Sequence, residues 1–139
     1  MITIEDVERF SEMNQTETKS PQEMVEEYHQ KAGLHINAKY ESMGNLDIIN
    51  LRKTLIKEEA LEVIEATEPE HLLKELADLV YVAYGFAVTF GWNLDESVKR
   101  VHENNIGRMK QPDGSIKRRE DGKVEKNKSY PKVDLSDLV

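Results

Sequence analysis

The sequence predicts an all-α fold: an antiparallel helical bundle of four to five helices, followed by a short C-terminal β-hairpin and an irregular arm. Apolar residues recur at helical spacing through two long segments, residues 46–67 and 69–90. Start and stop signals for helices bracket these segments, and a hairpin-type turn follows them. We expect residues 1–110 to form the helical domain and residues 111–139 to pack on it as hairpin and arm.

The first two helices are predicted from spacing and capping signals. Ile4–Met13 has apolar residues at three-residue intervals, which indicates a short helix. Ser20 and Pro21 supply the N-cap and the first position of a second helix, and Gly33 ends it. A short helical piece over Asn37–Met43 is a further expectation.

Three more helices and the hairpin follow. The third helix spans about Leu46–Thr67, and a proline at its first turn starts a fourth at Pro69–Phe90. A fifth helix is capped by Asn93 or Asp95 and runs to about residue 108. Residues 116–126 read as two short strands around an Asp-Gly turn, and the last stretch, Asn127–Val139, is expected to be an irregular arm.

Composition excludes several classes of protein. The formal net charge is −8, which disfavours binding to nucleic acid or to an anionic membrane by the surface as a whole. The absence of cysteine excludes thiol catalysis and thiolate metal sites. No secretory signal opens the sequence, and the most apolar segment, Leu72–Trp92, contains two acids. The expected compartment is the cytoplasm.

Acidic residues fall on faces that should be buried. In the third helix Glu59 and Glu62 lie within the apolar face, and Glu58 lies at its edge. In the fourth helix Glu75 lies at the edge of the apolar stripe and Asp78 one step further round. The predicted apolar faces consist of Ile48, Leu51, Leu55, Ile56, Val63 and Ala66 on the third helix, and of Leu72, Leu76, Leu79, Ala83, Phe86 and Phe90 on the fourth.

The spacing of these acids favours a metal site. Glu59 and Glu62 are three residues apart, and so are Glu75 and Asp78, so each pair shares one helix face. A carboxylate on a core face is costly unless it is paired or coordinates a cation. Two such pairs on antiparallel neighbours are able to surround an ion. Oxygen-only ligands favour Mg²⁺, or Mn²⁺, over zinc.

The acids match the pattern E-E-x-x-E … E-x-x-D of a known superfamily, with residues 58–62 followed by residues 75–78. The sequence therefore resembles the MazG-like all-α NTP pyrophosphohydrolases, which include dimeric dUTPases, dCTP pyrophosphatases and phosphoribosyl-ATP pyrophosphohydrolase. The resemblance covers about Leu46–Arg108. Residues 101–108, followed by Asp113-Gly114 and the hairpin, look like one bacterial and phage branch. A lysine is usual there at the position of Arg108, so the charge is kept and its geometry differs.

The resemblance implies a magnesium-dependent hydrolase that cuts a nucleoside triphosphate between its α and β phosphates and releases monophosphate and pyrophosphate. It implies that Mg²⁺ is held by the two acid pairs named above, and that Glu58 is the candidate general base for the attacking water. Asn105 and Arg108, about one turn apart on the fifth helix, are expected to bind phosphate oxygens of the substrate.

Two other functions compete with this hypothesis. A ferritin-like di-iron protein uses Glu-x-x-His motifs, and Glu26-x-x-His29 and Glu68-x-x-His71 have that form. Neither histidine is expected to lie in register with the acid cluster. The second alternative is a non-catalytic metal-binding or regulatory dimer, because the fourth helix is apolar almost all round. That surface predicts a homodimer or homotetramer in either case. The base and sugar of the substrate and the number of metal ions stay open.

Overall fold

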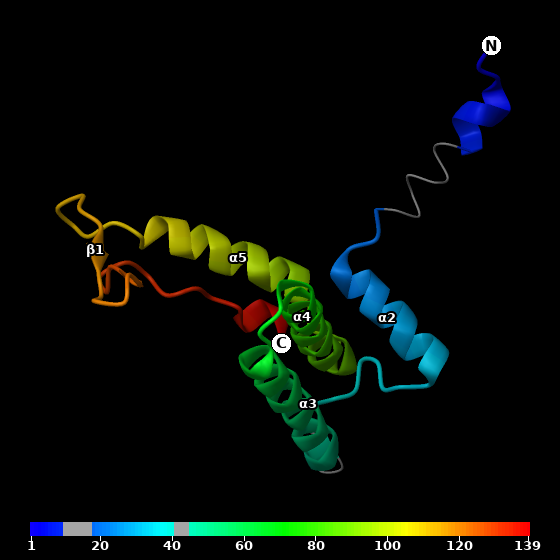
Figure 1. Ribbon diagram of the computed structural model, residues 1–139, viewed down its shortest axis with the longest axis horizontal. Coiled ribbons are helices and arrows are strands. Elements are labelled where there is room, and N and C mark those ends of the chain that lie inside the picture. Colours follow the sequence, from blue (N-terminus) through cyan, green and yellow to red (C-terminus); the bar gives the residue numbers. More distant parts are fainter. Residues whose placement is uncertain (10–17, 41–44) are drawn as a thin grey trace. The chain divides into compact units, whose positions relative to one another are not determined.

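The computed structural model describes residues 1–9, 18–40 and 45–139. They are mostly helical, with a two-stranded antiparallel sheet near the C-terminus, so the predicted fold class is confirmed. The chain forms two compact units, Met1–Trp92 and Asn93–Val139 (Figure 1). The predicted domain division at residue 110 stays a prediction. None of the described helices has the length and apolar run that a membrane span needs.

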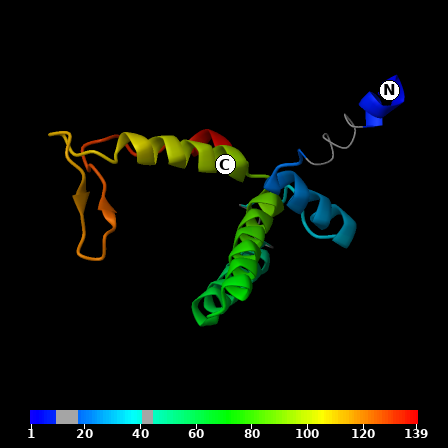
Figure 2. The same ribbon diagram turned by 45° about the horizontal axis from the view of Figure 1, so that its top comes forward.

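The first unit is built around α4. Helices α2 (Pro21–Ala32) and α3 (Leu46–Glu65) both pack against α4 (Pro69–Phe90), as Figures 1 and 2 show. Only residues 66–68 connect α3 to α4, and so short a link between packed helices makes them antiparallel. Residues 4–9 are helical as predicted, while the rest of that predicted helix lies outside the described residues.

Local signals explain why α2 and α4 begin and end where they do. Ser20 accepts a hydrogen bond from the Glu23 backbone, and the Glu23 carboxylate accepts one from the Ser20 backbone, which completes a capping box. Pro69 occupies the first turn of α4. Gly91 ends α4 in the left-handed conformation, with φ of 71°. These boundaries match the prediction to the residue.

The core lies at the C-terminal end of α4. Every residue from Tyr84 to Phe90 except Phe86 is buried there, and the rings of Tyr40, Phe86 and Trp92 surround Phe90. The segment after α2 covers this end, since Asn37 and Ala38 donate backbone hydrogen bonds to carbonyls of α4.

Two details of the first unit differ from prediction. Residues 37–40 are not helical, so the short helix expected at Asn37–Met43 is wrong there, and its remainder lies outside the described residues. On α3 the buried residues are Ile49 and Arg52, whereas Leu51, assigned to the apolar face, is half exposed. Periodicity identifies a broad face but not which flank of it meets the neighbouring helix.

The second unit consists of α5 (Leu94–Gly107), the strands β1 (Lys117–Arg118) and β2 (Val124–Glu125), and an arm ending in the 3₁₀ helix η2 (Ser136–Leu138). Asn93 caps α5 by accepting a hydrogen bond from the Glu96 backbone. The strands pair antiparallel across the predicted turn. The fifth helix, the hairpin and the arm are therefore confirmed.

The arm returns antiparallel along α5 (Figure 1). The Asn127 backbone donates to the Arg108 carbonyl, and the Asn104 side chain donates to the Pro131 carbonyl. At the middle of the helix Arg100 makes two hydrogen bonds to the Asp137 carboxylate, of 2.6 and 2.9 Å. Since α5 has no buried residue of its own, these contacts hold the arm in register along it.

Candidate functional site

Four carboxylates converge between α3 and α4. Glu59 and Glu62 come from the second half of α3, and Glu75 and Asp78 from the first half of α4. One oxygen of each lies within 4.8 Å of the others. Glu75 is buried, Glu59 and Asp78 are half-buried, and Glu62 is exposed. The helical spacing of three residues within each pair, and the antiparallel packing of the two helices, bring the pairs together.

Hydrogen bonding and repulsion perturb the carboxylates. Hydrogen bonds with Glu75 and Glu59, together with the negative charge of both, raise the pKa of Glu62 to about 7. The hydrogen bond from Glu62 lowers the pKa of Glu75, against the effect of burial, and Lys74 and His71 lower it further. Near neutral pH, Glu62 is thus partly protonated and Glu75 is ionised. Carboxylates held this close repel one another when ionised, and a cation bound among them would relieve that repulsion.

Two basic side chains of α4 border the cluster. His71 Nε2 lies 3.2 Å from Glu75 Oε1, and Lys74 Nζ lies 2.6 Å from Asp78 Oδ2 and 3.4 Å from Glu75 Oε1. The expectation that neither candidate histidine lies in register with the acids is therefore wrong for His71. The physical reason is simple: α4 starts at Pro69, so His71 and Glu75 are one turn apart on the same helix.

The residues of the cluster fit a divalent cation. Glu59 Oε2 and Glu75 Oε2 are buried and accept no hydrogen bond from any described residue. A buried carboxylate oxygen without a partner is costly, and coordination to a cation would satisfy it. The donors are all carboxylate oxygens, which suits Mg²⁺ or Mn²⁺.

Glu58 lies outside this group of four. It precedes Glu59 on α3, and its side chain is exposed. A step of one residue turns about 100° round the helix, so Glu58 and Glu59 point in different directions. Glu58 is thus not among the described carboxylates that converge, and its role as the base stays a prediction.

Asn105 and Arg108 belong to the second unit and are described there by themselves. Asn105 is exposed on α5, and Arg108 is the C-cap of that helix. Arg108 Nη1 lies 3.5 Å from Asn104 Oδ1, and its Nε is buried without a hydrogen-bond partner among the described residues. Sequence reasoning missed Asn104, which links Arg108 to the arm. The consecutive asparagines at the end of the predicted helix were the available signal.

His29, the other histidine of the di-iron hypothesis, is engaged elsewhere. It is 2% exposed, and its Nδ1 lies 2.9 Å from the His35 carbonyl oxygen. Its Nε2 faces Gly85 beside the guanidinium of Arg52. A cationic neighbour disfavours metal coordination by this ring, and Glu26 is not among the described acids that cluster. One histidine at one carboxylate does not reproduce the ligand set of a di-iron centre.

Comparison with known proteins identifies one family. Its sequence model, described as PRA-PH, phosphoribosyl-ATP pyrophosphohydrolase, matches residues 10–105, about two thirds of the chain. Among curated proteins no match was found. The matched range contains α2, α3, α4, all four clustered carboxylates and most of α5.

Proposed function

Because the chain belongs to the phosphoribosyl-ATP pyrophosphohydrolase family, we propose that it hydrolyses the α–β phosphate bond of a nucleoside triphosphate with the help of Mg²⁺. The family is part of the MazG-like all-α NTP pyrophosphohydrolase superfamily. The chain is accordingly a pyrophosphohydrolase, a hydrolase acting on phosphoric anhydride bonds. The nature of the substrate, the identity of the metal and the residue roles are the parts proposed here.

The observation that carries the proposal is the convergence of Glu59, Glu62, Glu75 and Asp78 within 4.8 Å on two antiparallel helices. A triphosphate is a polyanion, and it does not approach four carboxylates unless a cation reverses the local sign. The family membership and the acid cluster therefore support the same chemistry.

In this mechanism the four clustered carboxylates hold Mg²⁺, or Mn²⁺ in its place. The bound cation would neutralise phosphate oxygens and lower the pKa of water. Lys74 is ion-paired to Asp78, so a cation bound there would share this carboxylate with Lys74. Glu58 precedes the ligand Glu59 on α3 and has an exposed carboxylate, so it is the candidate to accept the proton of the attacking water.

Asn105 and Arg108 are proposed to bind the phosphates of the substrate. Arg108 offers a guanidinium whose Nε has no hydrogen-bond partner in the part of the chain that the structure describes, and such a group gains most from a charge-assisted hydrogen bond. The amide of Asn105 is exposed near the same end of α5.

An oligomer is also proposed. Apolar side chains of α2 and α4 are exposed on the first unit, and they line a hollow of about 330 Å³ that is almost entirely apolar. They include Met24, Leu73, Leu76, Val80 and Tyr81. Burying them in a homodimer or homotetramer would remove apolar surface from water. The cytoplasm stays the predicted compartment.

The test is a panel of nucleoside triphosphates and phosphoribosyl-ATP with Mg²⁺, with products separated by chromatography. Monophosphate and pyrophosphate are expected, and activity should vanish on exhaustive chelation and return with Mg²⁺ or Mn²⁺. Nucleoside diphosphate as the first product would reject the proposed bond. Mg²⁺ binding without hydrolysis of any member of the panel would favour the non-catalytic dimer.

Two variants separate the base from the ligands. Glu58→Gln should lower kcat by about 10²–10⁴-fold and leave Mg²⁺ affinity intact, because a positioned base contributes on that scale. Asp78→Asn should weaken Mg²⁺ binding, measured by calorimetry. An equal loss of metal affinity in both variants would make Glu58 a ligand instead.

A further inference from the structure

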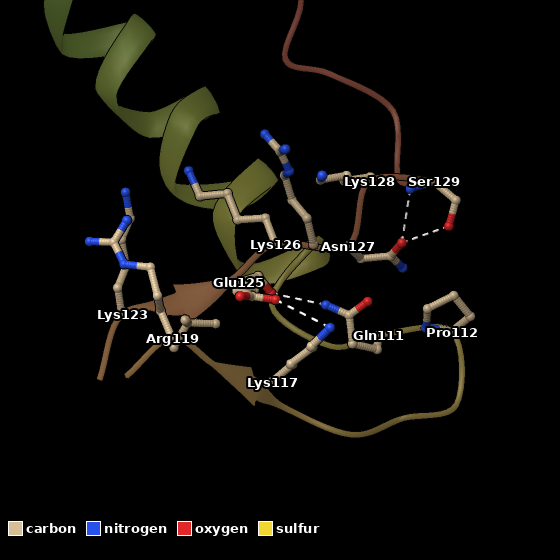
Figure 3. Close-up of a pocket in the computed structure, with 12 residues that line it drawn as sticks. Gln111, Pro112, Lys117, Arg119, Lys123, Glu125, Lys126, Asn127, Lys128 and Ser129 are labelled. Atoms are coloured by element: carbon tan, nitrogen blue, oxygen red, sulfur yellow. Dashed lines mark hydrogen bonds and ion pairs between the residues drawn. The ribbon is translucent and has the colours of Figure 1, made fainter. Parts of the chain in front are cut away.

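The second unit contains a basic pocket of about 760 Å³. It lies between the end of α5, the hairpin and the first residues of the arm (Figure 3). Its walls consist of Arg108, Gln111, Pro112, Lys117, Arg119, Lys123, Val124, Glu125, Lys126, Asn127, Lys128 and Ser129. The volume is in the range of small-molecule sites, which is about 300–1,000 Å³.

Of the described side chains that line the pocket, six are cationic and one, Glu125, is a carboxylate. Two of the cations are engaged: Lys117 Nζ lies 3.5 Å from Glu125 Oε2, and Arg119 pairs with Asp121. Within the described residues, Lys123, Lys126 and Lys128 make no ion pair. In a chain with a net charge of −8, so many unpaired cations round one hollow create a local positive field.

Two hydrogen bonds to backbone carbonyls hold the walls of this pocket together. The Asn127 backbone N–H donates to the Arg108 carbonyl at 2.8 Å, which ties the arm to the end of α5. Gln111 Nε2 donates to the Glu125 carbonyl at 3.0 Å, which ties the loop after α5 to β2. Figure 3 shows the contact between Gln111 and Glu125, together with the side chains of the lining lysines, Lys117, Lys123, Lys126 and Lys128. The backbone segments that carry the cations are therefore held together, and the lysines extend from them as exposed side chains.

We propose that this basic pocket binds a condensed phosphate, either free pyrophosphate or the phosphate tail of a nucleotide. Several close positive groups match the several charges of such a ligand, whereas a monophosphate would use only part of them. Among the described residues no aromatic ring lines the pocket, so these residues offer no stacking platform of the kind that single-stranded nucleic acid uses. The recognised chemistry is that of the phosphates and not of the base.

This inference goes beyond the proposed hydrolysis and shares only Arg108 with it. Calorimetry of the full-length chain in EDTA at low salt tests it, with inorganic pyrophosphate as the probe. The variant Lys123→Gln/Lys126→Gln/Lys128→Gln should bind about tenfold more weakly or worse, since each charge-assisted contact is worth about that factor. The charge-matched control Lys53→Gln/Lys99→Gln/Lys132→Gln changes exposed lysines outside the pocket and should bind within about twofold of the unmodified protein.

Two further probes identify the source of the phosphate. A non-hydrolysable triphosphate that binds more tightly than pyrophosphate, and is lost in the same triple variant, assigns the pocket to the nucleotide tail. Tighter binding of pyrophosphate than of the triphosphate assigns the pocket to free pyrophosphate. Adenosine monophosphate should bind about tenfold more weakly than either, because it offers fewer phosphate charges.

Several outcomes would overturn the inference. The first is that pyrophosphate does not bind, and the second is that the charge-matched control loses as much affinity for pyrophosphate as the triple variant of the pocket does. The others are that adenosine monophosphate binds as tightly as pyrophosphate, or that a single-stranded oligonucleotide binds more tightly than pyrophosphate. Asp78→Asn, which removes a proposed metal ligand, should leave this metal-free binding unchanged, and a loss there would place the anion elsewhere. Failure of hydrolysis with pyrophosphate binding intact would count against the proposed function alone.

Discussion

Replacing His29 by alanine should be among the most damaging single changes in the first unit. The ring is 2% exposed, it bonds through Nδ1 to the His35 carbonyl oxygen, and it rests against Gly85 of α4. It therefore links α2, the segment after α2, and α4. The substitution leaves a cavity at this junction and a carbonyl without its donor.

The size of the effect follows from these contacts. Large-to-small changes of buried side chains cost about 2–5 kcal/mol, and a lost hydrogen bond costs about 1 kcal/mol. Imidazole is smaller than a phenyl ring, so we expect His29→Ala to lower the free energy of unfolding by about 3–4 kcal/mol. Domains of this size have about 5–15 kcal/mol in total, so the variant should stay folded but fragile.

Urea denaturation at pH 8 measures this loss, followed by the fluorescence of Trp92, the single tryptophan of the chain. Trp92 belongs to the same unit as His29 and lies in the aromatic cluster at the end of α4. The control is His102→Ala, which changes an exposed histidine of α5 and should cost less than about 0.5 kcal/mol. A loss below about 1 kcal/mol for His29→Ala would refute the reasoning.

The pH dependence supplies a second readout. Burial lowers the pKa of His29 below 6.5, and the Arg52 charge lowers it further, although the hydrogen bond to His35 raises it. A depressed pKa means that the neutral ring contributes its full stability above pH 6.5 and loses it as the pH falls through the folded-state pKa. The stability difference between wild type and His29→Ala should therefore shrink from pH 8 to pH 5. Since Glu62 titrates in both proteins, a constant or growing difference would contradict the assignment.

Three further predictions concern a cap, the arm and assembly. Ser20→Ala removes the capping box of α2 and should lower urea stability by about 1 kcal/mol; no change would mean that Glu23 alone suffices. In Gly107→Ala the new methyl group would overlap the ring of Tyr130, so the arm should become more sensitive to limited proteolysis, with the helical circular dichroism signal retained. Light scattering at micromolar concentration should give a dimer or larger species, and a clean monomer would remove the proposed oligomer.

Helix boundaries were readable from the sequence because the signals are local. Pro69 and Gly91 act through their own backbone torsions, and the capping box at Ser20 needs only four consecutive residues. The sequence did not show that Arg52, and not Leu51, is buried on α3. Arg52 is buried because Gly85 of α4 leaves room for it beside His29. The periodicity of α3 cannot predict this space, because the space depends on residues of other helices.

In the candidate site, too, the features set by local spacing were predictable from the sequence, and those set by contacts between distant segments were not. The two acid pairs were predictable, since spacing within each helix and antiparallel packing suffice to join them. The contact of His71 with Glu75 was equally available from the helix start at Pro69. The basic pocket was not predicted, because its lysines are scattered over a turn, a strand and the arm, and become neighbours only after the hairpin closes.

The return of the arm along α5 has a consequence for synthesis on the ribosome. Residues of α5 leave the exit tunnel before their partners exist, and the contact between Arg100 and Asp137 spans 37 positions. Because α5 has no buried residue, we expect it to become stable only when the arm packs along it. By that time every element of Met1–Trp92 has been synthesised. The second unit should consequently fold last, and its protection against proteases should appear only once the residues of η2 have emerged.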